Sequence, residues 1–313
     1  KEKFLQFLFF KQWFALRNYC NQKQVRFIGD MPIYVSMDSV DVWVHRDLFK
    51  LDKDGYPSVV AGVPPDYFSK TGQRWGNPVY NWDALKKTGY DWWIRRIAHS
   101  LKLSDIVRID HFRGFVDFWE IPAGEETAVN GSWAKAPADD FFTTLMNKMP
   151  DMPIIAEDLG YLSDDARNAI KKFNLPGMRL MIFAFGEDNP NHPYLPGNFI
   201  ENCIGYTGTH DNNTIRGWFE NEAAAQEKER ALKYLKRKTA PKNIAWEFVK
   251  CVMASRANTV IMPVQDILGL GREARMNIPS RPEGNWEWRL LPGQVDPAVA
   301  KKLFDITKAS NRG

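Results

Sequence analysis

The stretch Ile106-Val107-Arg108-Ile109-Asp110-His111-Phe112 decides how the rest of this chain is interpreted. Its apolar, β-branched residues and its charged end predict a buried parallel strand that runs into a loop. Residues two apart on a strand point the same way, so Arg108 and Asp110 are expected on one face. A carboxylate beside a guanidinium stays ionised, as a covalent nucleophile must. An ordinary Arg–Asp pair at a strand end would leave the same pattern, so the stretch alone keeps both interpretations open.

Apolar stretches and helical patterns alternate along the chain. Strands, some with their exits, are predicted at residues 25–35, 106–110, 153–160, 178–184, 203–214 and 258–264. Helices are predicted at residues 3–20, 83–101, 138–149, 163–173, 221–238 and 243–254, with Asp83 and Ser163 as two of the N-caps. These six β-then-α units favour a parallel α/β fold. Because no repeat or interdomain linker interrupts them, we expect residues 1–313 to form one domain.

Two segments, residues 36–82 and 112–137, separate some of these elements and contain many turn-forming residues. Irregular stretches of this length usually serve function rather than connection. Both are therefore predicted to be long irregular loops beside the active site.

Three of the predicted strands end in a carboxylate, at Asp110, Glu157 and Asp211. These ends converge only if the strands close into a (β/α)8 barrel, in which the carboxyl ends of the strands meet at one mouth. A doubly wound sheet would spread them along one edge. The competing explanation is that the three acids are helix N-caps.

Acids that converge in this way suit sugar chemistry. Retaining glycosidases place a nucleophile and an acid/base carboxyl group about 5–5.5 Å apart. Asp110, beside Arg108, suits the ionised nucleophile. Glu157 follows the apolar run 154–156, where partial desolvation would raise its pKa towards that of a general acid. Asp211 could hold sugar hydroxyls and stabilise oxocarbenium-like charge.

Composition and motifs argue against several other classes of protein. Of the 313 residues 44% are hydrophobic, which is enough for a large core, and 42 basic and 38 acidic residues are interspersed, so nucleic-acid binding is not expected. The three cysteines are far apart and show no metal-ligand spacing, which favours a reducing compartment. We find no signal peptide and no apolar run that would span a bilayer, so membrane association is not expected. Phosphate-loop, dinucleotide, zinc and GxSxG motifs are also absent from the sequence.

Several motifs together resemble one known family. Around the three acids they read VRIDHFRGF, IIAEDLG and GYTGTHDNNT, and elsewhere GDMPIYV, GVPPDYF, GQRWGNPVYNW, DILGLGREARMNIP and GNWEWRLL. They resemble glycoside hydrolase family 77, the 4-α-glucanotransferases, which are also called amylomaltases or disproportionating enzymes. The resemblance covers nearly the whole chain.

The resemblance implies a role for each acid: Asp110 as nucleophile, Glu157 as acid/base and Asp211 as transition-state stabiliser. It adds substrate contacts or donor- and acceptor-site positions, which are Arg108, His111, His210, Asp66, Gln73, Trp75, Asp188 and Asn277. It implies no metal and no organic cofactor.

The implied fold is a TIM (β/α)8 barrel. The strand at residues 25–31 resembles the third of the eight, so the first two strands are expected to be missing from this chain. The implied activity is the transfer of α-1,4-glucan segments from a maltooligosaccharide or starch donor to a sugar acceptor. The expected location is the cytoplasm, or the plastid stroma in a plant, and the oligomeric state is left open.

Two alternatives and one refinement accompany this prediction. The alternatives are an α-amylase-like retaining hydrolase and a non-catalytic glucan-binding fragment. In a transferase, we expect the segment 54–82 to cover the cleft and exclude water, with Trp75 or Tyr67 exposed to the cleft. The aromatic residues concerned are Tyr56, Tyr67, Phe68, Trp75 and Tyr80. They could instead pack inward as a small core of the segment itself.

Overall fold

The computed structural model describes residues 1–66, 69–160, 162–236, 239–279, 281 and 283–312. Two compact units divide the chain, Lys1–Pro176 and Gly177–Gly313. The single domain expected over residues 1–313 stays a prediction.

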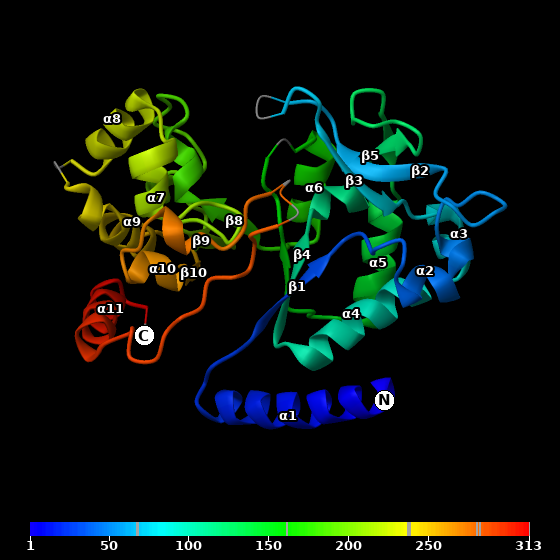
Figure 1. The fold of residues 1–313 in the computed structure, drawn as a ribbon, viewed down its shortest axis with the longest axis horizontal. Helices are drawn as coiled ribbons and strands as arrows, with labels where there is room; N and C mark the ends of the chain where they lie inside the picture. Colours follow the sequence, from blue (N-terminus) through cyan, green and yellow to red (C-terminus); the bar gives the residue numbers. More distant parts are fainter. Residues whose placement is uncertain (67–68, 161, 237–238, 280, 282, 313) are drawn as a thin grey trace. The chain divides into compact units, whose positions relative to one another are not determined.

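A parallel sheet of three strands carries the opening stretch of the sequence in the first unit (Figure 1). Its strands, in spatial order, are β1 (Ile28–Pro32), β4 (Ile106–Asp110) and β7 (Ile154–Ala156). The register sets Asp30 opposite Arg108, and Ile109 opposite Ala156. Because the strands are parallel, Asp110 and Glu157 leave neighbouring strands at the same edge of the sheet.

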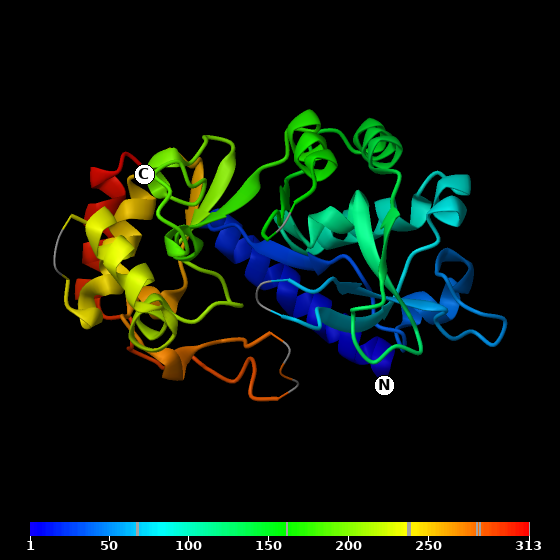
Figure 2. The same cartoon turned by 90° about the horizontal axis from the view of Figure 1, so that it is seen from above.

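Helices precede or follow these strands as the β-then-α pattern predicts. They are α1 (Glu2–Gln22), α4 (Asp91–Leu103), α5 (Ala138–Lys148) and α6 (Asp164–Lys172). Helix α1 lies beside the end of α4, where the Trp13 indole N–H donates to the carbonyl of Leu103 at 2.8 Å (Figures 1 and 2). The predicted cap of α6 is confirmed, since the Ser163 hydroxyl accepts from the N–H of Ala166.

The helix predicted over residues 83–101 is in fact two helices. Helix α3 (Trp82–Lys87) ends before Gly89 and Tyr90, whose φ angles of +59° and +57° break the right-handed path before α4 begins. The N-cap of α3 is Asn81, whose side chain accepts from the N–H of Ala84, and not Asp83 as predicted.

The prediction of irregular loops over 36–82 and 112–137 is wrong for parts of both segments. They contain α2 (Val40–Val44), the short 3-10 helices Arg46–Leu48 and Phe112–Phe115, and the strands β2 (Val59–Val63), β3 (Gln73–Pro78), β5 (Asp117–Pro122) and β6 (Ser132–Lys135). The four strands form an antiparallel sheet in the order β3-β2-β5-β6. Pairing between distant segments stabilises this sheet, and the Gly- and Pro-rich local sequence gives little sign of it.

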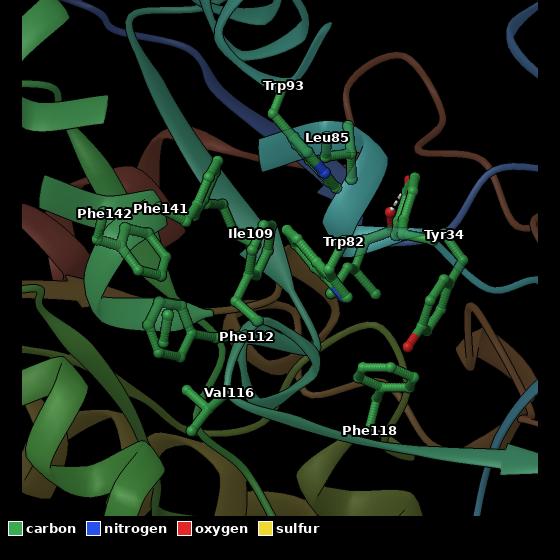
Figure 3. Close-up of a cluster of buried hydrophobic side chains, with 14 of the residues drawn as sticks. Tyr34, Trp82, Leu85, Trp93, Ile109, Phe112, Val116, Phe118, Phe141 and Phe142 are labelled. Carbon is green, nitrogen blue, oxygen red and sulfur yellow. Dashed lines mark hydrogen bonds between the residues drawn. The ribbon is translucent and has the colours of Figure 1, made fainter. Parts of the chain in front are cut away.

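The main core of the first unit is largely aromatic (Figure 3). The rings of Phe115 and Phe141 stack with centroids 5.1 Å apart, and Trp93 meets Phe115 edge-on at 4.8 Å. Strand β4 contributes Val107 and Ile109, both fully buried, to this core. Arg108 and Asp110 alternate with them and face the other way, so one side of β4 anchors the strand and the other presents the charged side chains.

The second unit holds another parallel sheet, in the order β8-β9-β10. Its strands are β8 (Gly177–Leu180), β9 (Cys203–Tyr206) and β10 (Thr259–Ile261). The strand predicted to reach residue 184 ends at Leu180, and a 3-10 turn over Met181–Phe185 replaces the remainder.

The helical segments of the second unit follow its strands. They are α7 (Ile215–Gly217), the π-helical turn Trp218–Glu222, α8 (Ala225–Tyr234), α9 (Ile244–Met253), α10 (Val264–Ile267) and α11 (Pro297–Ala309), with short 3-10 turns at Pro196–Asn198, Pro241–Asn243 and Arg272–Ala274. Helix α11 packs on α9, where Val299, Leu303 and Ile306 contact the cluster of Val249 and Met253 (Figure 2).

The observed architecture confirms an α/β fold, with parallel pairing within the sheet β1-β4-β7 and within the sheet β8-β9-β10. The described residues show these strands as two sheets of three and show no closed barrel. Within the described part of the chain, no helix is long and apolar enough to cross a membrane.

The aromatic core generates a stability prediction. Phe141→Ala should lower the free energy of unfolding by about 3–5 kcal/mol, because it removes a fully buried ring with several aromatic neighbours. The matched control is Phe304→Ala on α11, where the ring is 55% exposed and the loss should be about 1 kcal/mol or less. Urea denaturation of both variants measures the difference, and equal losses would contradict the described core.

Candidate active site

The buried guanidinium of Arg108 organises the exit of β4. One nitrogen, Nη1, donates to both carboxylate oxygens of Asp30 at 2.6 and 2.8 Å, and Nη2 lies 2.9 Å from Oδ1 of Asp110. The Arg108 side chain is 9% exposed, whereas both carboxylates are 45% exposed. Burial opposes the charged guanidinium, yet the charges of Asp110 and Asp30 raise the pKa of Arg108 above its usual value. The cation is therefore permanent, and it orients a carboxylate that remains accessible.

Glu157 sits at the adjacent strand end in a different environment. Its two carboxylate oxygens accept backbone N–H bonds from His111 and Leu159, each at 2.8 Å. Burial, followed by the negative charge of Asp110, raises the pKa of Glu157 to about 7, although Arg108 and the two N–H bonds oppose the shift. Glu157 can therefore hold or release a proton near neutral pH, as a general acid/base requires.

His111 contacts Glu157 through its backbone N–H and Trp75 of β3 through its ring. Its backbone is left-handed, with φ +51°, which turns the chain sharply at the end of β4. Burial and the neighbouring Arg113 lower the pKa of His111 to about 4, so the imidazole is neutral at pH 7. The Trp75 ring meets it edge-on, with centroids 4.9 Å apart. Trp75 also donates its indole N–H to Oε1 of Gln73 at 3.1 Å.

Other residues of the segment 54–82 are divided between surface and core. Asp66 is exposed and holds a turn, because its Oδ1 accepts from the N–H of Ser69 at 2.7 Å. Tyr56 is 68% exposed, and Trp75 is 36% exposed. Tyr80 is fully buried and donates to the carbonyl of Ile33, so of the two alternatives left open for these aromatic residues, Tyr80 follows the inward packing. The predictions for Tyr67 and Phe68 lie outside the described residues.

In the second unit, three of the predicted site residues lie together. Asn277 donates its side-chain N–H to Oδ1 of Asp211 at 2.7 Å, and Nε2 of His210 lies 3.3 Å from Oδ2. The backbone N–H of Asn277 also donates to the carbonyl of His210 at 3.1 Å. Asp211 therefore has an amide donor and an imidazole as its side-chain contacts.

Asp188, also in the second unit, makes other contacts. Its carboxylate is 70% exposed and lies 3.6 Å from the ammonium of Lys233. It lines a cavity of about 730 Å³, together with Phe185 and Tyr234. This position suits a surface ion pair as well as a substrate contact.

From the sequence, Asp30 fell within the predicted strand and exit at residues 25–35 and was not assigned to the site. The signal was available, because Asp30, like Asp110 and Glu157, is an acid near the end of a strand. Two others, Arg275 and Trp286, were also missed. Arg275 donates to the carbonyl of Asp211 at 3.0 Å, and the Trp286 ring lies 5.1 Å from the His210 ring. No local pattern marks either residue.

Comparison with known proteins identifies the family. The model of glycoside hydrolase family 77, described as 4-alpha-glucanotransferase, matches residues 1–294. The chain therefore belongs to this family, as the motif resemblance predicted.

Relatives with this description are found in several bacteria. The 4-alpha-glucanotransferase of Clostridium butyricum is 48% identical over 99% of this chain and 63% of its own length. That of Aquifex aeolicus is 51% identical over 97% of this chain and 62% of its own length. The solved amylomaltase of Streptococcus agalactiae, in complex with acarbose, has a TM-score of 0.95 and 45% identity over 98% of this chain and 62% of that structure. The chain thus spans about three-fifths of the length of these relatives.

The raised pKa of Glu157 generates a prediction about stability and pH. A carboxyl group with a higher pKa in the folded protein binds its proton more tightly there, so stability is lost as pH rises from about 4.5 to about 7. Relative to Glu157→Gln, which stays neutral, the wild type should lose at most about 3 kcal/mol of unfolding free energy over this range. Urea denaturation of both proteins at pH 4.5 and pH 8 tests this. A difference between them that does not change with pH would show that Glu157 has an ordinary pKa.

Proposed function

We propose that this protein is a 4-α-glucanotransferase, which transfers α-1,4-glucan segments between maltooligosaccharides or starch chains by a retaining double displacement. One observation carries the proposal. Asp110, held by buried Arg108, and Glu157, with its pKa raised to about 7, leave neighbouring parallel strands at the same sheet edge. A retaining mechanism needs an ionised and a protonated carboxyl group side by side. The family to which the chain belongs supports the same chemistry.

In the first step, a carboxylate oxygen of Asp110 attacks the anomeric carbon of the donor sugar. The bond from that carbon to the glycosidic oxygen breaks, and a glycosyl ester forms on Asp110. The guanidinium of Arg108 aims the attacking carboxylate through their ion pair. About half of the Asp110 side chain is exposed, which leaves it open to a substrate.

Glu157 supplies and recovers the proton. It protonates the departing glycosidic oxygen in the first step, and in the second it accepts the proton of the acceptor's 4-hydroxyl as that oxygen displaces Asp110. A pKa of about 7 makes both protonation states accessible during the cycle. Leu159 and His111, whose N–H groups bind the two oxygens, keep the carboxyl group oriented.

The proposal gives Asp211 the task of stabilising the oxocarbenium-like charge. It also assigns the six strands of the two parallel sheets to the third to eighth strands of a (β/α)8 barrel. The contacts of Asp211 with Asn277 and His210 support a role as an oriented carboxylate.

The proposal also covers the remaining predicted sites and the location. Sugar rings would contact Trp75 and His111, and Asp66, Gln73 and Asp188 would serve donor or acceptor positions. No cofactor takes part in these steps. We propose a cytoplasmic or plastid location, in line with a potato relative named as chloroplastic or amyloplastic.

Incubation of the protein with maltotriose as the sole substrate tests the activity. A transferase yields glucose and a ladder of longer oligosaccharides, because sugar displaces the glycosyl-enzyme, whereas a hydrolase yields only shorter sugars. Asp110→Ala should lower the rate at which the ladder forms by a factor of about 10⁴ or more. Glu157→Gln should still react slowly with a donor that has a good leaving group, because protonation is then dispensable.

Each alternative has its own outcome in the same experiment. Short products without a ladder would replace the transferase with an α-amylase-like hydrolase. Binding of maltotriose without any product would leave a glucan-binding fragment. An Asp110→Ala variant with wild-type activity would remove the proposed nucleophile.

Trp75 generates a prediction about the competition between sugar and water. Its partly exposed ring, beside His111, is placed to stack on an acceptor sugar and exclude water. Trp75→Ala should therefore raise the ratio of hydrolysis to transfer severalfold, with total donor cleavage falling less than transfer does. The measurement compares free reducing ends with disproportionation products. Trp43→Ala on α2, which removes an exposed aromatic ring outside the segment 54–82, serves as the control, and equal ratios in the three proteins would contradict this role for Trp75.

A further inference from the structure

The loop that carries Asp211, residues 208–214, lies between β9 and α7 and is flanked by Thr207 and Ile215. Within the loop, Oδ1 of Asn212 accepts from the backbone N–H of Thr209 at 2.9 Å and from its hydroxyl at 3.2 Å. These short-range bonds shape the turn. They do not by themselves determine where the turn lies relative to the sheet, which depends on the bonds from Asn277 and Arg275 to its carbonyls and on the contacts of its two ends.

Both ends of the loop are bound to one carboxylate, that of Asp266. The hydroxyl of Thr207, directly before the loop, donates to Oδ2 at 2.7 Å. The backbone N–H of Ile215, directly after the loop, donates to Oδ1 at 2.8 Å. All three residues are buried, with Asp266 1% exposed and the other two fully enclosed. The Asp266 carboxylate thus links the two ends of the loop.

Asp266 is suited to this bridging in its ionised form, which accepts at both oxygens. Burial raises its pKa to about 6, although the bonds from Ile215 and Thr207 oppose the shift. At pH 7 to 8 it is therefore mainly ionised. Hydrogen bonds to a buried charge are strong and directional, so they restrict the two donors more than neutral bonds would.

Helix α10, which carries Asp266, also binds the segment from which Asn277 contacts Asp211. Gln265, next to Asp266 on α10, donates to the carbonyl of Ala274 at 3.3 Å. Three residues later Asn277 binds the Asp211 carboxylate and the His210 carbonyl. Helix α10 therefore joins the loop of Asp211 to the segment that orients its side chain.

We infer that Asp266 is a positioning residue for Asp211. By accepting hydrogen bonds from both Thr207 and Ile215, it fixes the position and orientation of the 208–214 loop. The inference rests on the proposed role of Asp211. Asp266 itself contacts no reacting atom in this scheme. Displacing a transition-state group by about 1 Å can cost about 10²-fold in rate. Because Asp211 acts on the transition state, the cost appears in kcat more than in KM.

Thr207 offers the sharper test, because Asp266→Ala removes both bonds and could prevent folding. Thr207→Val keeps the shape of the side chain and removes only the hydroxyl, whereas Thr207→Ser keeps the hydroxyl. In the intact protein, Thr207→Val should lower kcat for maltotriose about 10-fold or more, with KM changed less than about 2-fold. Thr207→Ser should restore most of the rate.

Amide hydrogen exchange supplies a readout that does not depend on activity. In Thr207→Val, exchange over residues 208–217 should be about three- to tenfold faster than in Thr207→Ser, with other peptides unchanged. The control for general destabilisation is Leu235→Ala, which truncates a buried side chain at the end of α8 and should leave kcat and this exchange near wild type.

The outcomes separate this inference from the proposed function. Unchanged kcat and unchanged loop exchange in Thr207→Val would overturn the positioning role, as would equal losses of kcat in Thr207→Val and Leu235→Ala. If the wild type makes no transfer products, the proposed function fails. Exchange then decides alone whether Asp266 holds the loop, with faster exchange in Thr207→Val supporting it and unchanged exchange overturning it.

Discussion

A buried guanidinium needs compensating charge, and Arg108 imposes this requirement on two strands. Removing one partner of a buried ion pair typically costs about 3–5 kcal/mol, so Arg108 needs Asp30 on β1 as well as Asp110 on its own strand. This need agrees with the register that sets Asp30 opposite Arg108. A slip of β4 by one residue would turn Arg108 into the aromatic core and Ile109 out of it. The same interaction therefore stabilises the sheet and aims the carboxylate of Asp110.

The three strand-end acids differ mainly in what surrounds them. Asp110 has a permanent cation beside it and stays accessible. Glu157 is partly buried and feels the charge of Asp110, which raise its pKa to about 7 against the opposing effect of two backbone N–H bonds. Asp211 is held by an amide and an imidazole. Carboxyl groups at similar positions can thus suit the different roles proposed for them, because the environment sets their protonation and orientation.

The antiparallel sheet shows where local patterns stop being informative. Strand β3 contains Gly76 and Asn77 and ends at Pro78, so its sequence resembles a loop. It is a strand because β2 pairs with it, and β2 pairs in turn with β5 on its other side. This sheet also positions Trp75 against His111. The aromatic residues of the segment 54–82 have different environments: Tyr80 is part of the core, whereas Trp75 stays partly exposed.

The amino-acid sequence by itself determined the α/β class, the six strands of the two parallel sheets, and the acids that end or follow three of these strands. These depend on the period of apolar residues and on the polar residues that follow them, and both are local properties. Only the tertiary structure decided which groups meet at those ends. Asn277 reaches Asp211 from 66 residues away, and Asp266 binds Thr207 and Ile215 across 59 and 51 residues. Contacts of this kind arise when packed elements bring distant side chains together, and no spacing along the chain encodes them.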